Sequence, residues 1–230
     1  MINGKKVLGI IPARGGSKGI KKKNIKLLNG KPLITWTIES ARRSAFLDKV
    51  IVSSDDEEIM DISKKFGAEV PFKRPTNLAQ DDTPGIDPIL HALENFKDYE
   101  YVVLLQPTSP LRRSEDIDNA IKLCITNNAT SCISVVENST PFQWIYKMNN
   151  DSRLTNLFNN EYFPYQRQKA ETTYVLNGAV YVVVSKSLIE HKSFIQNDTV
   201  AYVMPKERSV DIDDLNDFYY CDYLLKNLTI

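Results

Sequence analysis

Short apolar runs and amphipathic stretches alternate along the first part of the chain. Continuous apolar runs are typical of parallel strands covered on both faces. They fall within 5–12, 49–53, 101–105 and 131–136. Apolar residues at helical spacing fall within 32–41, 54–66, 86–96 and 115–127. This alternation predicts an α/β fold with a mostly parallel sheet and right-handed crossovers.

The pattern changes after residue 136. Residues 137–173 are polar and aromatic, without a persistent helical period. We interpret them as an inserted subdomain, an antiparallel hairpin that packs on a partner. Strand and helix patterns return at 175–184, 186–191, 199–204 and 213–228. Since no linker or repeat separates these parts, we expect one domain over 1–230 with an insertion at 137–173.

Composition narrows the class of protein. The 230 residues carry no net charge, which argues against nucleic-acid binding by bulk attraction. No stretch approaches the roughly 20 apolar residues of a membrane span, and the first apolar run ends at Arg14, too early for a signal peptide. The three cysteines lack a CxxC spacing and only two histidines occur, which argues against disulfides and zinc. We expect a cytoplasmic protein that binds neither nucleic acid nor membrane.

One loop, residues 14–24, combines flexible backbone with positive charge directly after the first strand. Gly15, Gly16 and Gly19 let backbone N–H groups approach an anion closely, and Arg14 and four lysines add charge. Open α/β sheets bind ligands at the carboxyl ends of their strands. We therefore interpret the loop as a cradle for pyrophosphate, with a solvated basic turn as the alternative. Its spacing is neither a Walker A motif nor GxGxxG.

Further short blocks follow this loop along the whole chain. The blocks are IPARGGSKG at 11–19, KN at 23–24, RP at 74–75, LA at 78–79, DT at 82–83, HAL at 91–93, QPTSPLR at 106–112, NGA at 177–179 and DID at 211–213. In this order they resemble the acylneuraminate cytidylyltransferases, the CMP-sialic acid synthetases. A single block would be weak evidence, but the ordered set is specific.

This resemblance implies a Rossmann-like three-layer sandwich with a small inserted dimerisation subdomain, and a homodimer. It implies an enzyme that couples CTP to a nine-carbon α-keto acid sugar, whose anomeric hydroxyl attacks the α-phosphate and releases pyrophosphate. The catalytic cations that hold the triphosphate would be Arg14, Lys18 and Lys23. The nucleotide would contact Ala13, Gly15, Gly16, Ser17, Asn24, Arg74 and Thr83. The sugar acid would contact Gln106, Arg167, Asn177 and Tyr181.

A pair of carboxylates near the C-terminus predicts a metal site. In an extended segment, Asp211 and Asp213 point to the same face while Ile212 points to the other. Two carboxylates on one face suit a hard cation such as Mg²⁺ (or Mn²⁺) bridging phosphate oxygens. The resemblance places the family's metal-binding aspartates in this block. The alternative is that Asp213 or Asp214 only caps the last helix.

Several alternatives stay open. Three of the predicted sugar contacts also have a structural alternative. Gln106 could belong to a rigid turn, Arg167 could be a surface cation, and Tyr181 could be an aromatic residue of a strand. After Thr140-Pro141, similar bacterial sialic acid enzymes carry a lysine, whereas this chain has FQW at 142–144. This run resembles enzymes for legionaminic or pseudaminic acid at least as much as those for neuraminic acid.

Three other functions compete with this interpretation. They are a CMP-Kdo synthetase, a non-catalytic sugar-nucleotide-binding protein of the same fold, and a GT-A glycosyltransferase, whose DxD block usually follows an internal strand.

Overall fold

A six-stranded sheet forms the centre of the protein, in a computed structural model that describes residues 1–157 and 166–227. Its strands, in spatial order, are β10 (Val200–Val203), β6 (Ser131–Glu137), β9 (Tyr174–Val184), β5 (Tyr101–Leu104), β1 (Val7–Pro12) and β4 (Lys49–Ser53). The helices are α1 (Leu33–Arg42), α2 (Glu57–Lys65), α3 (Asp87–Glu94), α4 (Ser114–Thr126), α5 (Ser185–His191) and α6 (Leu215–Asn227). No helix in the described ranges is both long and apolar enough to cross a membrane.

The predicted mostly parallel sheet is confirmed, with one exception in its middle. Strand β1 pairs in parallel with β4 and β5, and β6 pairs in parallel with β10. Strand β9 runs antiparallel to both β5 and β6. The chain leaves β6 for the insertion and returns from it at the same end of the sheet, so the returning strand must run the opposite way. The direction of β9 was not predicted.

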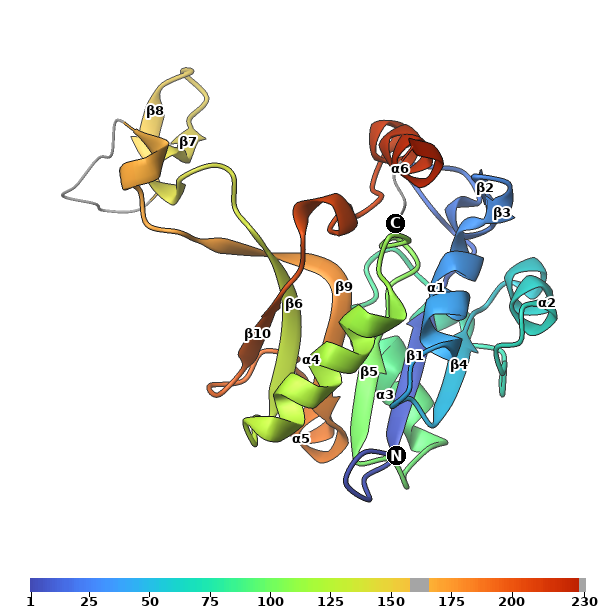
Figure 1. The fold of residues 1–230 in the computed structure, drawn as a ribbon. Coiled ribbons are helices and arrows are strands. Elements are labelled where there is room, and N and C mark those ends of the chain that lie inside the picture. The colour runs from blue at the N-terminus through green and yellow to red at the C-terminus, as the bar shows by residue number, and fades with distance from the viewer. Residues whose placement is uncertain (158–165, 228–230) are drawn as a thin grey trace.

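Helices cover both faces of the sheet, which gives the predicted three-layer sandwich (Figure 1). Successive side chains of a strand point to opposite faces. Val7 and Ile11 of β1 therefore join a core beneath α1, α2 and α4, and Leu8 and Ile10 join a second core beneath α3 and α5. These core positions are fully buried. The continuous apolar runs of the sequence thus correspond to strands that are buried on both faces of the sheet.

Local signals place most helix ends where the sequence predicts them. Asp56 caps α2, because its carboxylate accepts a hydrogen bond of 3.0 Å from the Ile59 N–H. Gly67 follows the helix in the left-handed region, with φ of 84°. Residues 68–70, after this helix, form one parallel bridge to β4, between Glu69 and Ile51. The last helix ends at Asn227, and residue 228 lies outside the described chain.

A third core holds the C-terminal helix over the glycine-rich loop. Phe218 and Cys221 of α6 pack with Ile20 and with Leu28 of the small hairpin formed by β2 (Leu27–Leu28) and β3 (Lys31–Pro32). Ile212, just before α6, is fully buried in the same cluster. The acidic segment at 211–213 is therefore fixed beside the loop that follows β1.

The insertion forms an arm that stands away from the sheet in Figure 1. Strands β7 (Tyr146–Met148) and β8 (Leu154–Asn156) pair as an antiparallel hairpin. Met148 lies directly opposite Leu154, and the two side chains are 69% and 65% exposed. The predicted hairpin is present, but residues 158–165 of the segment lie outside the described chain. Its role in dimerisation stays a prediction.

Candidate active site

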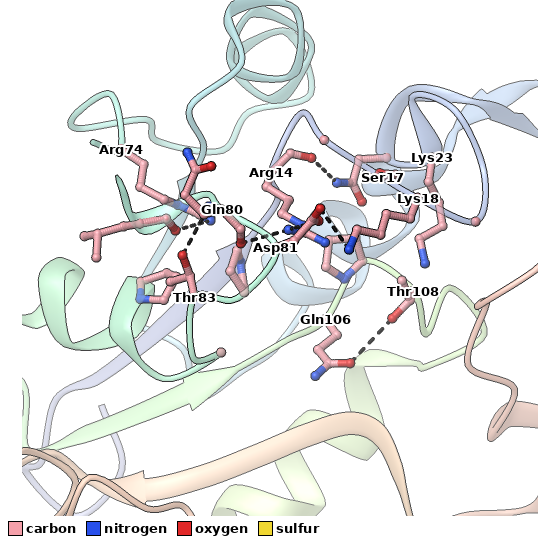
Figure 2. Close-up of a pocket in the computed structure, with 18 of the residues that line it drawn as sticks. Arg14, Ser17, Lys18, Lys23, Arg74, Gln80, Asp81, Thr83, Gln106 and Thr108 are labelled. Atoms are coloured by element: carbon pink, nitrogen blue, oxygen red, sulfur yellow. Dashed lines mark hydrogen bonds and ion pairs between the residues drawn. The ribbon is translucent and has the colours of Figure 1, made fainter. Parts of the chain in front are cut away.

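A cleft of about 440 Å³ opens at the carboxyl ends of β1 and β5 (Figure 2). This is the edge where open α/β sheets bind ligands. The predicted residues that line it are Arg14, Gly16, Ser17, Lys18, Lys23, Asn24, Arg74, Thr83, Gln106 and Asp213. The predicted residues that do not line it, all within the described chain, are Ala13, Gly15, Arg167, Asn177, Tyr181 and Asp211. One cleft therefore collects the predicted cations, the nucleotide loop and one carboxylate.

The three predicted catalytic cations reach the cleft from the glycine-rich loop, and each has a partner. The Arg14 guanidinium pairs with Asp81 at 2.8 Å and donates to the Gln80 carbonyl at 2.9 Å. The Lys18 ammonium pairs with the other oxygen of Asp81 at 3.0 Å. Lys23 Nζ donates to the Ile212 carbonyl at 2.6 Å, so the loop is tied directly to the acidic segment.

The glycines of this loop also serve close packing. The Gly15 N–H donates to the Asp55 carboxylate at 3.0 Å, so this N–H is occupied within the fold. A Cβ on Gly15 would lie 2.7 Å from a carboxylate oxygen of Asp56, and a Cβ on Gly19 would lie 2.5 Å from the Asp213 carbonyl oxygen. A Cβ on Gly16 would meet no atom within 4 Å. Gly16 is thus the loop glycine most open to a ligand among these three.

The residues predicted to hold the nucleotide mainly shape its side of the cleft. Arg74 is 3% exposed, and its guanidinium donates to the Ser53 hydroxyl at 3.1 Å, the Ser53 carbonyl and the Leu78 carbonyl at 3.5 Å. Burial lowers the pKa of Arg74 to about 10. Thr83 donates to the Asn77 carbonyl at 3.1 Å. These bonds hold the loop after β4 in one shape.

Two other predicted nucleotide residues act through the backbone of the glycine-rich loop. The Ala13 N–H donates to the Ser53 carbonyl at 2.9 Å, continuing the ladder between β1 and β4. The Asn24 amide donates to the Arg14 carbonyl at 2.9 Å. Both contacts fix where the loop begins and turns, which sets the position of the Arg14 side chain.

On the opposite wall, Gln106 projects into the cleft at the end of β5 (Figure 2). A buried arginine holds its turn in place, since Arg112 donates to the Gln106 carbonyl at 3.2 Å and to the Ala179 carbonyl at 2.7 Å. Burial lowers the pKa of Arg112 to about 9, against the nearby charge of Asp116. Arg112 thereby joins the turn after β5 to strand β9.

Asn177 and Tyr181 lie on β9 behind the cleft. The Asn177 side-chain oxygen accepts from the Ser134 hydroxyl at 2.6 Å, and its amide nitrogen donates to the Ser209 hydroxyl at 3.0 Å. This buried amide therefore joins β9 to its neighbours. The Tyr181 ring packs edge-on against Phe194, with centroids 5.5 Å apart. Burial raises the pKa of Tyr181, and the charge of Asp211 adds to the rise.

Arg167 lies on the arm, in a short turn at Arg167–Lys169. It borders a separate hollow between the arm and β10 that also involves Ser139 and Lys206. Within one chain, the structure does not bring Arg167 to the cleft that Gln106 lines.

The acidic segment presents one carboxylate to the cleft and the other to the protein interior. Ile212 points into the third core and its N–H donates to the Thr108 carbonyl at 2.8 Å. Asp213 lines the cleft. One carboxylate oxygen of Asp211 is buried without a hydrogen-bond partner among the described residues. Burial raises the pKa of Asp211, a hydrogen bond from Thr108 opposes the rise, and Asp213 adds to it.

The donor set fits a hard divalent cation only in part. A buried carboxylate oxygen without a partner is costly, and an oxygen-seeking cation would satisfy it. The described residues contain no group of three or more side chains suited to metal binding, so a cation here would complete its coordination with water or phosphate oxygens. Helix capping falls to Asp214, whose carboxylate accepts from the Asn216 and Asp217 N–H groups at 2.7 and 3.1 Å.

Sequence reasoning missed four residues that the structure brings to the site: Gln80, Asp81, Thr108 and Arg112. Thr108 and Arg112 belong to the block at 106–112, so their presence near Gln106 was within reach. The sequence block at 82–83 points to Asp82 rather than Asp81, and the partners of Asp81 lie more than sixty residues earlier in the chain.

The sequence matches the profile of the cytidylyltransferase family over residues 8–220. It is 40% identical, over 93% of its length, to N-acylneuraminate cytidylyltransferase of Escherichia coli O18:K1:H7, and spans 50% of that relative. It is 33% identical to pseudaminic acid cytidylyltransferase of Campylobacter jejuni, covering 96% of this chain and 97% of the relative. CMP-N,N'-diacetyllegionaminic acid synthase of Legionella pneumophila is also 33% identical, with the same coverage of 96% and 97%.

Solved structures show the same fold at low sequence identity. CMP:2-keto-3-deoxy-manno-octonic acid synthetase, solved with CTP, matches with a TM-score of 0.71 and 17% identity, over 96% of this chain and 99% of that one. 4-Diphosphocytidyl-2C-methyl-D-erythritol synthase from Anaerococcus prevotii matches with a TM-score of 0.70 and 14% identity, over 98% of both chains.

Proposed function

The chain belongs to the cytidylyltransferase family, and from this membership we propose that it transfers CMP from CTP to a nine-carbon α-keto acid sugar. The acceptor would be an N-acylneuraminic, legionaminic or pseudaminic acid, matching the named relatives. Its anomeric hydroxyl attacks the α-phosphate and pyrophosphate leaves. The observation that carries the proposal is the convergence of Arg14, Lys18, Lys23 and Asp213 on one cleft.

The cations supply charge where the reaction develops it. As the bond to the α-phosphate breaks, negative charge grows on the leaving pyrophosphate, and fixed cations stabilise that charge. Arg14 and Lys18 reach into the cleft from one side of the loop, and Lys23 lies beside the Ile212 carbonyl. Asp211 and Asp213 would hold Mg²⁺ or Mn²⁺, which when bound offsets the negative charge of the phosphates.

The wall around Gln106 would receive the sugar acid. The Gln106 amide can donate to a carboxylate or accept from a hydroxyl, and Arg112 fixes its turn from behind. Tyr181 and Asn177 would support this wall from β9. Arg167 can pair with a carboxylate in bidentate fashion, but it lies on the arm, away from the cleft of its own chain. We therefore assign Arg167 to the cleft of a second subunit.

This assignment requires a homodimer joined through the arm. Tyr146, Met148 and Leu154 share one exposed face of the β7–β8 hairpin, and clustered exposed apolar side chains mark interaction surfaces. We expect Met148→Asp combined with Leu154→Asp to convert the dimer to a monomer, measured by size-exclusion chromatography with light scattering. Thr155→Asp, on the opposite face, is the control. A monomeric unmodified protein would contradict the proposed dimer.

The cysteines support a reducing compartment as the site of the reaction. All three are free and buried, and burial raises the pKa of each thiol to about 12. Such thiols are unreactive and serve packing. This cysteine usage agrees with our proposal of a cytoplasmic enzyme.

The proposed reaction is tested by pyrophosphate release. We expect release only when CTP, a nonulosonic acid and a divalent cation are all present. The acceptor panel is N-acetylneuraminic, legionaminic and pseudaminic acid, together with Kdo. Release with Kdo alone would favour the CMP-Kdo synthetase alternative, whose fold this chain shares. If none of the four acceptors supports release, the enzymatic proposal is wrong and a non-catalytic nucleotide-binding role gains ground.

A further inference from the structure

An acidic side chain stands among the cations of the cleft. The two carboxylate oxygens of Asp81 are divided between two partners, one with Arg14 at 2.8 Å and one with Lys18 at 3.0 Å (Figure 2). Both partners belong to the loop that, on the proposed function, binds the triphosphate. Asp81 thus already makes the contacts that phosphate oxygens would make there.

The loop after Arg74 presents Asp81 in this position. The Gln80 carbonyl accepts from Arg14 at 2.9 Å, and the Gln80 N–H donates to the Thr83 hydroxyl at 3.1 Å. The Gln80 amide donates to the Thr76 carbonyl at 2.7 Å. The first contact ties the backbone before Asp81 to the glycine-rich loop, and the other two stabilise the loop that carries Asp81. The hydrogen bond with Lys18 and the charge of Arg14 also hold the pKa of Asp81 below its ordinary value, so the carboxylate stays ionised at neutral pH.

We propose that Asp81 is an internal counter-anion that competes with the triphosphate of CTP for Arg14 and Lys18, and that returns to them as pyrophosphate leaves. This inference rests on the proposed function, because that function places the triphosphate on these cations. The competition is intramolecular. The carboxylate can therefore pair with Arg14 and Lys18 again as soon as a phosphate group dissociates from them.

The exposure of Asp81 and Lys18 to solvent determines whether the carboxylate or the polyphosphate occupies the cations. The Asp81 side chain is 49% exposed and that of Lys18 is 75% exposed, and ion pairs in such surroundings contribute little to stability. A polyphosphate carries several charges to the same cations, so it displaces the carboxylate. After the transfer, the leaving pyrophosphate has lost its covalent link to the nucleoside. The returning carboxylate then has the larger relative effect, because it competes with a ligand held by the cations alone.

The opposite role for Asp81 makes the opposite prediction. If Asp81 supported the triphosphate, by holding a cation or by orienting Arg14, its removal would weaken anion binding. If it competes, removal strengthens anion binding. The sign of the change therefore separates the two roles, and a merely structural role for the loop could not produce tighter binding.

The experiment measures binding of inorganic pyrophosphate, without added divalent cation, to the full chain by isothermal titration calorimetry. We expect Asp81→Asn to bind pyrophosphate about threefold to fivefold more tightly than the unmodified protein, a gain in the upper part of the range for an exposed ion pair. Asp82→Asn is the matched control. It removes the same charge one residue away, from an exposed side chain that is not among the described residues lining the cleft. Its affinity should change by less than about twofold.

Kinetics give a second readout on the same variants. Asp81→Asn should lower the KM for CTP, strengthen product inhibition by pyrophosphate and lower kcat where pyrophosphate release limits turnover. Asp81→Ala guards against an effect peculiar to asparagine, and should behave in the same way. Equal or weaker pyrophosphate binding by both variants overturns the inference and leaves the proposed function standing. If the unmodified protein binds neither pyrophosphate nor CTP, the proposed function itself fails, and the inference fails with it.

Discussion

Replacing Asp211 with asparagine is expected to lower kcat about a thousandfold and to raise the melting temperature of the metal-free protein. The two effects share one cause. One oxygen of the Asp211 carboxylate is buried without a partner among the described residues, and burial raises the pKa of this group. A negative charge held in this position costs stability until a cation offsets it. Asparagine removes the charge and keeps the shape.

The expected size of each effect follows from general magnitudes. A metal ion at a phosphoryl group supplies several kcal/mol of charge stabilisation, so losing it should lower kcat about a thousandfold. Relief of the buried charge is worth on the order of 1 kcal/mol, or about 2–4 °C in a domain of this size. Pyrophosphate release and thermal unfolding in the presence of a chelator measure the two effects.

The stability gain should depend on pH with a definite sign. A carboxyl whose pKa is raised in the folded state binds a proton more readily there than in the unfolded chain. Its stabilising contribution is present below the unfolded pKa and is lost as the pH rises through the raised pKa of Asp211. The difference between the variant and the unmodified protein should therefore be largest at neutral pH and should shrink as the pH falls through that range.

Asp214→Asn is the control for this prediction. Asp214 caps α6, and asparagine caps helices as well as aspartate does. Both activity and melting temperature should stay close to those of the unmodified protein. Near-normal turnover by Asp211→Asn would remove Asp211 from the proposed metal site.

Gly19→Ala should lower kcat/KM at least about a hundredfold in an otherwise folded protein. The added Cβ would lie 2.5 Å from the Asp213 carbonyl oxygen. Because both groups belong to the backbone, one of the two segments must move. Those segments carry Lys18 and Lys23 on one side and Asp213 on the other, and shifts of about 1 Å at reacting groups cost roughly this much in rate.

Gly16→Ala is the comparison for this variant. It lies in the same loop, and its Cβ would meet no atom within 4 Å. Because Gly16 borders the cleft and is a predicted nucleotide contact, its added Cβ should act mainly by raising the KM for CTP. Gly19→Ala should instead lower kcat. Equal losses of kcat in the two variants would show that the contact with Asp213 does not matter for the rate. Melting curves for both variants separate a local displacement from general unfolding.

Much of the fold could be predicted because it depends on local patterns. The apolar runs at 49–53 and 101–105 correspond to β4 and β5. Ile212, predicted to point away from its neighbouring aspartates, is buried in the third core, but only Asp213 of the two aspartates lines the cleft. The direction of β9 depends on where the insertion returns to the sheet. No local sequence pattern indicates this position. Patterns within a window predict elements, but the pairing of distant elements decides the topology.

The site was predictable in its residue types and less so in its contacts. The cations of the glycine-rich loop are evident from the sequence, but their partner Asp81 comes from a loop that only the fold brings near. The sequence predicts Arg74 as a ligand-binding cation. In the structure its guanidinium donates hydrogen bonds to three carbonyl or hydroxyl groups of the chain. Asn177 likewise joins strands through its amide. Polar residues in these blocks build the walls of the cleft as well as bind within it.

The arm joins the sheet through a narrow base, and this has a consequence for how such proteins diversify. The chain departs and returns side by side, where Glu137 pairs with Tyr174 and the Asn138 N–H donates to the Thr173 carbonyl at 2.8 Å. A segment whose two ends already meet can be lengthened, shortened or exchanged at small entropic cost. On the proposed function, an arm exchanged at this base would bring a different segment around Arg167 to the cleft of the second subunit, without any change to the sheet.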